Sequence, residues 1–201
     1  DLHGYVSAGK AFETPTQAEM AYAPGVSETF NFGLKPATST QYEIGLKARL
    51  SERSRLNVAL FEIHTDDEIV VSGSNSGRTS YTNGGKTLRR GLEVGLQNRL
   101  AQDWDLNLAY THLDATYRDD VTGGSSQIEK GNRLPGVPRD SLFGELVWKP
   151  VAGLSTALEG QYRSQVYVED SNYQKAAPAY TVFNWRARME QQLDRFTVYE
   201  M

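Results

Sequence analysis

The residues of this sequence that could do chemistry are charged and aromatic, and none forms a recognisable catalytic pattern. The chain has 201 residues, no cysteine and three histidines. His3, His64 and His112 lie far apart, and neither the H-x-x-x-H nor the H-E-x-x-H spacing of a zinc site occurs. The glycine patterns of phosphate and dinucleotide loops are also missing. We therefore expect no enzyme, no catalytic residue and no cofactor.

Two acidic runs could hold a divalent cation, because carboxylate oxygens are the ligands that calcium prefers. One run is Asp66, Asp67 and Glu68, and the other is Asp119 and Asp120. The D-x-[DN]-x-[DN]-G spacing of a calcium loop is absent from both. We interpret the runs as solvated charge and expect no metal site.

The overall charge excludes one class of partner. The chain has 21 Lys and Arg against 25 Asp and Glu, a formal net charge of −4, and no run of five or more basic residues. A generic nucleic-acid binder carries a basic patch or stripe, so we expect no nucleic acid.

The elements that must position these residues follow a period of two. From Tyr42 to Leu50, apolar and polar residues alternate, which predicts a β-strand with one apolar face. The same alternation recurs along most of the chain, and residues 55–71 form a longer and less regular strand. The other alternating segments are 92–100, 104–111, 141–148, 154–163 and 183–189.

The connections between these strands alternate strictly between short and long. The short ones are 51–54, 101–103, 151–153 and 191–194, and the long ones are 11–38, 72–85, 117–138 and 170–179. An up-and-down meander has this pattern when one rim carries tight turns and the other carries large loops. We predict an all-β chain of about nine antiparallel strands, the last beginning near Phe196 and truncated.

Two architectures are compatible with the alternation. A soluble β-sandwich packs its apolar faces together, whereas a membrane barrel turns them to lipid and its polar faces to a wet interior. No run of about 18 apolar residues occurs, but membrane β-strands need none. The alternation of loop lengths, the charged polar faces and aromatic residues near strand ends favour the barrel. These aromatic residues are Tyr42, Trp104, Trp148 and Trp185.

Five short motifs resemble those of the TonB-dependent outer-membrane receptors, and they come in that family's order across nearly the whole chain. Each motif alone is weak, but five in order make a specific resemblance. They are FETPT at 12–16, LKP at 34–36 with YEIGLK at 42–47, ALFEI at 59–63 with DDEIVV at 66–71, YTNGGKT at 81–87 with RGLE at 90–93, and LPGVPR at 134–139.

The resemblance implies a barrel of about 22 strands closed by a plug, in the outer membrane of a Gram-negative bacterium. A coupling protein, TonB, acts on that plug, and the cargo is a ferric siderophore or a similar scarce nutrient. We expect residues 1–201 to be a single region from the later part of the barrel, without the plug and the last strand. The chain lacks an initiator Met and ends at Met201 inside an apparent strand, as a piece of a larger protein would.

The resemblance also assigns roles to charged residues. Ferric siderophores are often anionic, and arginine with aromatic residues suits them. Ordinary loop polarity is the alternative explanation for each of these residues. Lys86 lies with the first group in and after the second long loop, and Tyr117, Arg118, Tyr167 and Tyr173 are weaker candidates on neighbouring loops. The candidate ligand-binding residues are Arg78, Tyr81, Arg89, Arg90, Tyr117 and Arg118.

A row of residues on the polar strand faces is expected to line the barrel interior and to dock the plug. The alternative is a solvated sheet face whose charges pair across strands. The row also includes Gln97 and Gln161, and its charged members are Glu43, Lys47, Arg49, Glu93, Arg99, Glu159, Arg163, Arg186 and Arg188.

The function hypotheses differ in what covers the apolar faces of the strands. The first hypothesis is a part of an outer-membrane receptor, in which membrane lipid contacts the apolar faces. The second is a soluble β-sandwich that binds a carbohydrate-type ligand through exposed aromatic residues such as Trp104 and Trp148. A hydrolase on an all-β scaffold is the least favoured.

Overall fold

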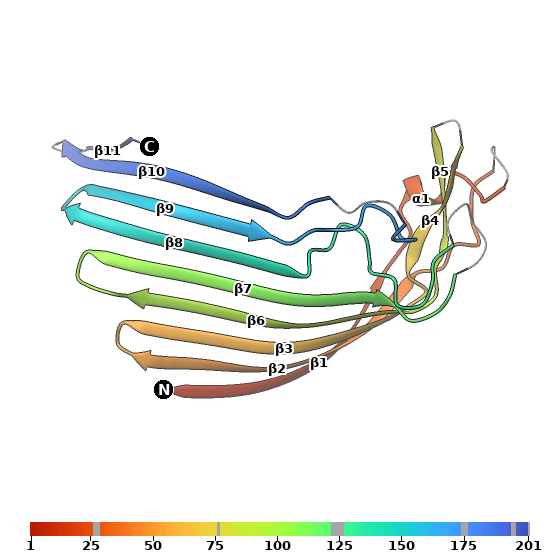
Figure 1. The fold of residues 1–201 in the computed structure, drawn as a ribbon, viewed down its shortest axis with the longest axis horizontal. Coiled ribbons are helices and arrows are strands. Elements are labelled where there is room, and N and C mark those ends of the chain that lie inside the picture. The colour runs from red at the N-terminus through yellow and green to blue at the C-terminus, as the bar shows by residue number, and fades with distance from the viewer. Residues whose placement is uncertain (26–28, 76, 122–126, 174–176, 194–195, 201) are drawn as a thin grey trace.

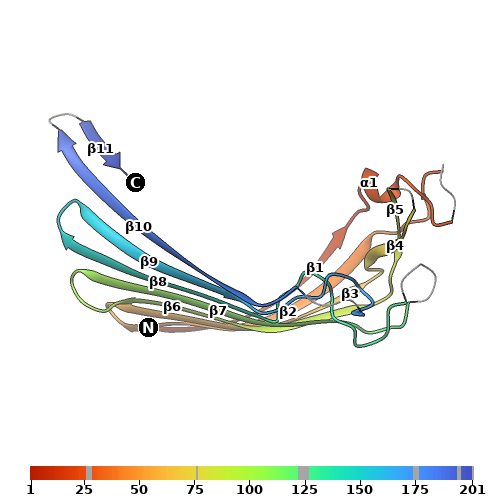
Figure 2. The same ribbon diagram turned by 45° about the horizontal axis from the view of Figure 1, so that its top comes forward.

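The structure is a computed structural model that describes residues 1–25, 29–75, 77–121, 127–173, 177–193 and 196–200. Nine antiparallel strands form one sheet with the order β1-β2-β3-β6-β7-β8-β9-β10-β11. The sheet is a curved, open wall with tight turns at one end and long segments at the other (Figures 1 and 2). The prediction of an all-β, nine-stranded meander is confirmed. The strands are β1 (Leu2–Glu13), β2 (Ala37–Ser51), β3 (Ser54–Asp66), β6 (Thr87–Arg99), β7 (Trp104–Tyr117), β8 (Asp140–Val151), β9 (Leu154–Arg163), β10 (Tyr180–Leu193) and β11 (Phe196–Glu200).

One predicted strand is wrong at its loop end. The chain leaves the main sheet after Asp66, and β4 (Ile69–Asn75) pairs with β5 (Arg78–Asn83) in a separate two-stranded sheet. Asp67 has a φ of 57°, which a β-strand does not accommodate, so the long strand 55–71 is broken there. The predicted loop 72–85 therefore contains most of a hairpin. Ser76 lies outside the described residues, as does Asp194 at the end of the predicted turn 191–194.

The strand register sorts the side chains into two faces. Paired residues in an antiparallel sheet point to the same side, so each row across the strands belongs to one face. One row joins Ile44, Leu60 and Leu92, and the neighbouring row on the opposite face joins Gly45, Ala59 and Glu93. We call the side with Ile44 the apolar face and the side with Glu93 the polar face.

Glycine on the polar face makes room for one aromatic ring. Gly45 on β2 lies opposite Tyr5 on β1, and a Cβ at Gly45 would overlap the Tyr5 ring. The ring therefore lies flat over the β2 backbone. From there the Tyr5 hydroxyl donates a hydrogen bond to Glu43 at 2.5 Å.

The long segments lie together at one end of the sheet (Figure 1). We call the described residues of 14–36, 67–86, 118–139 and 164–179 the loop layer. It contains β4, β5 and the single-turn helix α1 (Gln17–Met20), and no described helix is long and apolar enough to cross a membrane. Its buried apolar cluster joins loop residues to the end of β7 and consists of Val70, Ala115, Tyr117, Ile128 and Leu134.

Candidate functional site

The apolar face is a band of exposed hydrophobic side chains. It begins with the row of Ile44, Leu60 and Leu92 near the loop layer and ends with Trp104 and Trp148 near the turns. Leu60 is 53% exposed and Leu158 is 54% exposed, although both lie inside strands. An exposed apolar surface that continues across several strands marks a face that binds a partner or a membrane.

Aromatic side chains lie at both boundaries of this band. Near the turns, the rings of Trp104 and Trp148 stack with centroids 5.6 Å apart, and Trp148 Nε1 donates a hydrogen bond to Asp103 at 3.2 Å. Trp185 lies one row further into the band, on β10. Tyr42 lies at the opposite boundary, in the row of Glu62 and Arg90. Amphipathic rings take such positions at membrane–water interfaces.

The register places all the charged residues predicted for the barrel interior on the polar face. Arg186 on β10 is their best-connected member, because its guanidinium pairs with Glu145 at 2.7 Å and also with Glu159. Asn107 extends this group by donating a hydrogen bond to Glu145 at 3.0 Å. Glu93 and Arg163 are exposed. The remaining contacts are Glu43 with Tyr5, Lys47 over the Tyr5 ring, Arg49 with Asp1, Arg99 with Asp105, and Arg188 with Glu190.

A polar hollow of about 530 Å³ lies on this face near the turns. Asp105 lies in its lining and pairs with Lys149 at 2.6 Å and with Arg99 at 3.3 Å. Arg55 and Gln97 also line the hollow. These groups give the hollow side chains of both signs of charge.

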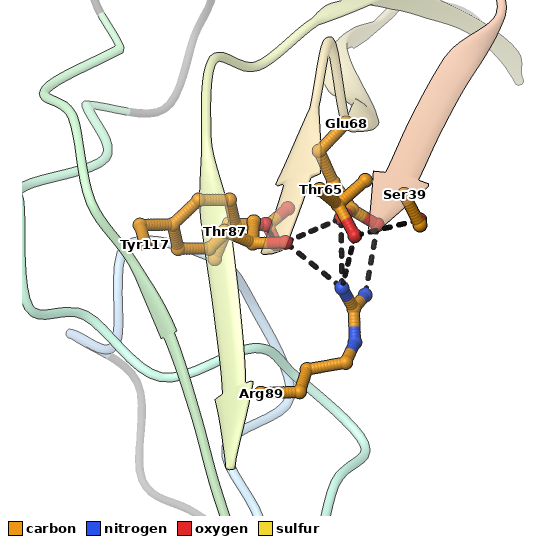
Figure 3. Close-up of polar contacts among 7 residues, drawn as sticks. Ser39, Thr65, Glu68, Thr87, Arg89 and Tyr117 are labelled. Carbon is orange, nitrogen blue, oxygen red and sulfur yellow. Dashed lines mark hydrogen bonds and ion pairs between the residues drawn. The ribbon is translucent and has the colours of Figure 1, made fainter. Parts of the chain in front are cut away.

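At the loop end of the polar face, Arg89 is the centre of a hydrogen-bonded cluster (Figure 3). Its guanidinium binds Glu68 through two parallel contacts, at 2.9 and 3.0 Å, and also donates to Thr87 at 2.8 Å and to Thr65 at 3.2 Å. Thr87 donates to Glu68 at 2.6 Å. The Arg89 and Glu68 side chains are only 25% and 18% exposed. Glu68 belongs to the loop layer, so this cluster fastens the layer to the sheet.

Tyr117 lies beside this cluster, at the end of β7 beyond the apolar band. It is 2% exposed, and its hydroxyl donates to Asp170 at 2.5 Å. Burial raises the pKa of Tyr117, and the hydrogen bond to the Asp170 carboxylate raises it further. The phenol therefore stays protonated at neutral pH and joins β7 to the segment before β10.

The six predicted ligand-binding residues do not form one cluster. Arg89 and Tyr117 lie on the polar face and are engaged as described above, whereas Arg90 lies on the apolar face and pairs with Asp114 at 3.3 Å. Arg78 stacks over the Tyr22 ring at 5.4 Å, in the loop layer. Tyr81 lies on β5, where its carbonyl accepts a hydrogen bond from Asn31, and Arg118 is exposed just after β7.

The carboxylates of four of the five residues in the two acidic runs bind a described partner. Asp66 pairs with Lys86 at 3.4 Å, whereas Glu68 pairs with Arg89. Asp119 and Asp120 accept backbone N–H groups of Lys86 and Lys130. Within the part of the chain that the structure describes, no group of three metal-ligating side chains occurs.

Two asparagines that no sequence pattern predicted join two segments of the loop layer. Asn172, with a φ of 57°, accepts the Arg133 N–H at 2.7 Å and donates to the Arg133 carbonyl at 2.9 Å. Asn132 donates to the carbonyls of Asp170 and Ser171. The only signal for Asn172 is that asparagine tolerates the left-handed conformation better than most residues.

These features define the class of protein. An open antiparallel meander with an exposed apolar face, a charged opposite face, aromatic boundaries and long loops at one end is the wall of an outer-membrane type of β-barrel. Residues 1–199 match the family described as TonB dependent receptor-like, beta-barrel, and the chain belongs to this family.

The relatives agree with this assignment. The chain is 26% identical over 172 residues to the probable TonB-dependent siderophore receptor PiuA of Acinetobacter baumannii. The matched region covers 81% of this chain and 22% of that protein. The crystal structure of the siderophore receptor PiuA from Acinetobacter baumannii has a TM-score of 0.71 at 21% identity and covers 94% of this chain and 27% of that one. The copper transporter OprC has a TM-score of 0.73 at 16% identity, with 95% and 29% covered.

The chain thus spans about a fifth of the length of the curated relative, at 22%. Its fold is that of a barrel wall, and no described residue provides a second sheet large enough to cover the apolar face, because the only other sheet is the hairpin β4–β5. The soluble β-sandwich is therefore not favoured.

Proposed function

We propose that this chain forms part of the barrel wall of an outer-membrane receptor of a Gram-negative bacterium that imports a ferric siderophore or a similar scarce nutrient. The observation that carries the proposal is the family match over residues 1–199, on a sheet whose faces are sorted into apolar and charged. Transport is energised by TonB acting on a plug, and the apolar face lies against membrane lipid. No catalytic role is proposed.

The polar face supports docking of the plug. The Arg186 group and the hollow around Asp105 present paired charges of both signs, which suit a polar partner that must detach and return. An apolar interior would hold a plug by the hydrophobic effect and release it less readily. We therefore assign plug docking to the charged polar-face residues.

The loop layer supports capture of the cargo. Arg78, Tyr81 and Arg118 lie there or at its edge, and they are the candidates to contact an anionic ligand. Arg89 and Tyr117 are committed to Glu68 and Asp170, so we assign them a positioning role that fixes the loops above the interior.

Uptake of radioactive iron tests the proposal. Iron-starved cells that lack the full-length gene are complemented with it and given a panel of ferric siderophores. We expect accumulation with at least one siderophore, and only when both the receptor and the TonB protein of the inner membrane are present. The proposal would be contradicted if no siderophore needed the receptor and TonB for its iron to accumulate in the cells.

A matched pair of variants tests the polar face. Arg186→Gln removes the cation between Glu145 and Glu159, and we expect slower energised uptake with unchanged binding of the siderophore to cells. Lys10→Gln removes an equal charge from the apolar side of β1 and serves as the control. Equal uptake by the two variants would contradict the docking role of Arg186.

A further inference from the structure

Two phenylalanine side chains of the loop layer are exposed and lie side by side. Phe30 is 60% exposed and Phe32 is 84% exposed, and the centroids of their rings are 5.7 Å apart with a tilt of 31°. Both belong to the segment between α1 and β2, so neither is part of the apolar band on the sheet. Because exposed apolar area is unfavourable in water, a pair of uncovered rings in a fixed place indicates a surface that binds something.

The chain between the two rings is fixed by hydrogen bonds to its neighbours. The Asn31 N–H donates to the Met20 carbonyl at the end of α1, and the Asn31 side chain donates to the Tyr81 carbonyl on β5, both at 2.8 Å. Helix α1 lies close to β5 (Figure 1). Phe30 and Phe32 flank Asn31, so the backbone that carries both rings is held in place before any ligand arrives. Binding to preformed positions costs less ordering of the protein.

The base of this segment is attached to the same hairpin, β4–β5. The Lys35 N–H donates to Asn83 Oδ1, and the Asn83 side chain donates to the Lys35 carbonyl, both at 2.9 Å. Leu34 is 8% exposed, in contrast to the two phenylalanines. The segment therefore has a buried, hydrogen-bonded base and presents its aromatic rings outward.

The hairpin also brings a positive charge to this surface. Arg78 on β5 stacks over the Tyr22 ring at 5.4 Å. The Ala23 N–H donates to the Thr29 carbonyl at 2.9 Å, so the stretches that carry Tyr22 and Phe30 are hydrogen-bonded neighbours. One cation and three aromatic rings thus share this part of the loop layer. We call them the aromatic site, which consists of Tyr22, Phe30, Phe32 and Arg78.

We propose that the aromatic site binds the aryl rings of a negatively charged ferric complex, which assigns the cargo to the catecholate or phenolate class. The inference rests on the proposed function, in which the loop layer captures the cargo. Ring faces favour a ligand that has rings of its own, because aromatic pairs are more favourable than their buried area alone predicts. Arg78 favours a complex of negative charge. A hydroxamate complex of iron offers neither feature, and ferric citrate offers the charge without the rings.

Equilibrium dialysis of the full-length protein in detergent against complexes of radioactive iron tests this inference. The probes are a ferric triscatecholate, ferric citrate and a ferric trihydroxamate, which separate the effect of rings from that of charge. Each aromatic pair changes affinity by about two- to tenfold. We therefore expect the wild-type protein to bind the triscatecholate at least about tenfold more tightly than either ring-free complex.

Variants assign this preference to the rings and to the cation. Phe30→Leu/Phe32→Leu keeps apolar side chains but removes the ring faces, and it should weaken binding of the triscatecholate about tenfold. Phe12→Leu is the matched control, because Phe12 is 74% exposed but lies on the apolar side of β1, and its affinity should stay within about twofold of the wild type. Arg78→Gln should weaken both anionic complexes by up to about fivefold.

The possible failures are distinguishable. Equal affinity of the wild-type protein for the triscatecholate and for a ring-free complex would overturn the inference and leave the proposed import of iron standing. An unchanged affinity of Phe30→Leu/Phe32→Leu would also overturn it, because another part of the receptor would then cover the rings. Binding of none of the three complexes would overturn the siderophore part of the proposed function as well.

Discussion

The sheet and the loop layer are stabilised in different ways. The loop layer packs against the end of β7 in a buried apolar cluster, in which Ile128 of the layer and Ala115 of β7 are each 1% exposed. On the sheet, by contrast, large side chains such as Leu60 and Trp185 remain exposed, at 53% and 72%. The loop layer therefore gains hydrophobic stabilisation from packing on the end of β7, whereas the apolar face of the sheet stays uncovered by the described residues of this chain.

Hydrogen bonding differs in the same way. The sheet is held by a continuous backbone ladder, for example from Thr87 to Arg99 against β7. The loop layer uses side chains of single residues, notably Asn132, Asn172 and Asn83, to satisfy backbone groups of other segments. A ladder tolerates the loss of any one side chain better than a layer that depends on a few asparagines.

The largest expected effect is in the loop core. Ile128→Ala leaves a cavity in a fully buried site, and it should destabilise the loop layer by about 2–5 kcal/mol. Hydrogen exchange of the full-length protein should show lost protection in residues 127–139 and at the loop end of β7 near Ala115 and Tyr117, and none in β6 or in the rest of β7. Val168→Ala, at a position that is 56% exposed, serves as the control. Equal loss of protection in the sheet would mean that the two regions are one cooperative unit.

The next effect distinguishes the two faces of one strand. Leu108 and Ala109 are neighbours on β7, with Leu108 near the middle of the apolar band. Leu108→Arg should cost about 2–4 kcal/mol of folding free energy in lipid vesicles, and Ala109→Arg close to zero. Urea unfolding of the full-length protein in vesicles measures both. The assignment of the faces fails if Ala109→Arg is the more damaging change.

Asn172 separates conformation from hydrogen bonding in the loop layer. Asn172→Gly keeps the left-handed φ but loses the side-chain bonds to Arg133, and it should destabilise the junction by about 1 kcal/mol. Asn172→Ala adds the steric penalty of that φ, about 1–2 kcal/mol more. Hydrogen exchange at the Arg133 amide gives both values, and indistinguishable values would contradict the role of the backbone conformation.

The smallest effect concerns the aromatic boundary. The stacked pair of Trp104 and Trp148 should show a coupling energy of about 0.5–1.5 kcal/mol in a double-mutant cycle with leucine. Urea unfolding in vesicles of the wild type, the two single variants and the double variant provides the cycle. A coupling energy of zero would mean that the rings act independently at the interface.

The sequence predicted the sheet well because alternation depends only on local spacing. Tyr42 to Leu50 and the similar segments identify the strands and their faces without knowledge of any partner. The broken strand at Asp67 escaped prediction because the apolar residues Ile69 to Val71 continue the pattern after the chain has left the sheet. A left-handed residue changes the direction of the chain but does not change the hydrophobic pattern.

The candidate site was predictable in part. Strand alternation alone places the neighbours Arg89 and Arg90 on opposite faces of the sheet. A prediction that both contact one ligand is inconsistent with that alternation. The partners of Arg89 and Tyr117 were not predictable, because Glu68 and Asp170 reach them from loop segments that lack any periodicity.

Single-cysteine accessibility along β7 tests the central claim most directly, since the chain has no native cysteine. Spin labels are placed one at a time from residue 105 to residue 110 in the full-length protein in nanodiscs, and relaxation by oxygen is compared with relaxation by a water-soluble nickel complex. We predict strict alternation, in which Leu106, Leu108 and Tyr110 are exposed to oxygen from lipid and Asp105, Asn107 and Ala109 to the nickel complex. Uniform access of the nickel complex to all six positions would contradict the assignment of this sheet as a barrel wall with one face in lipid.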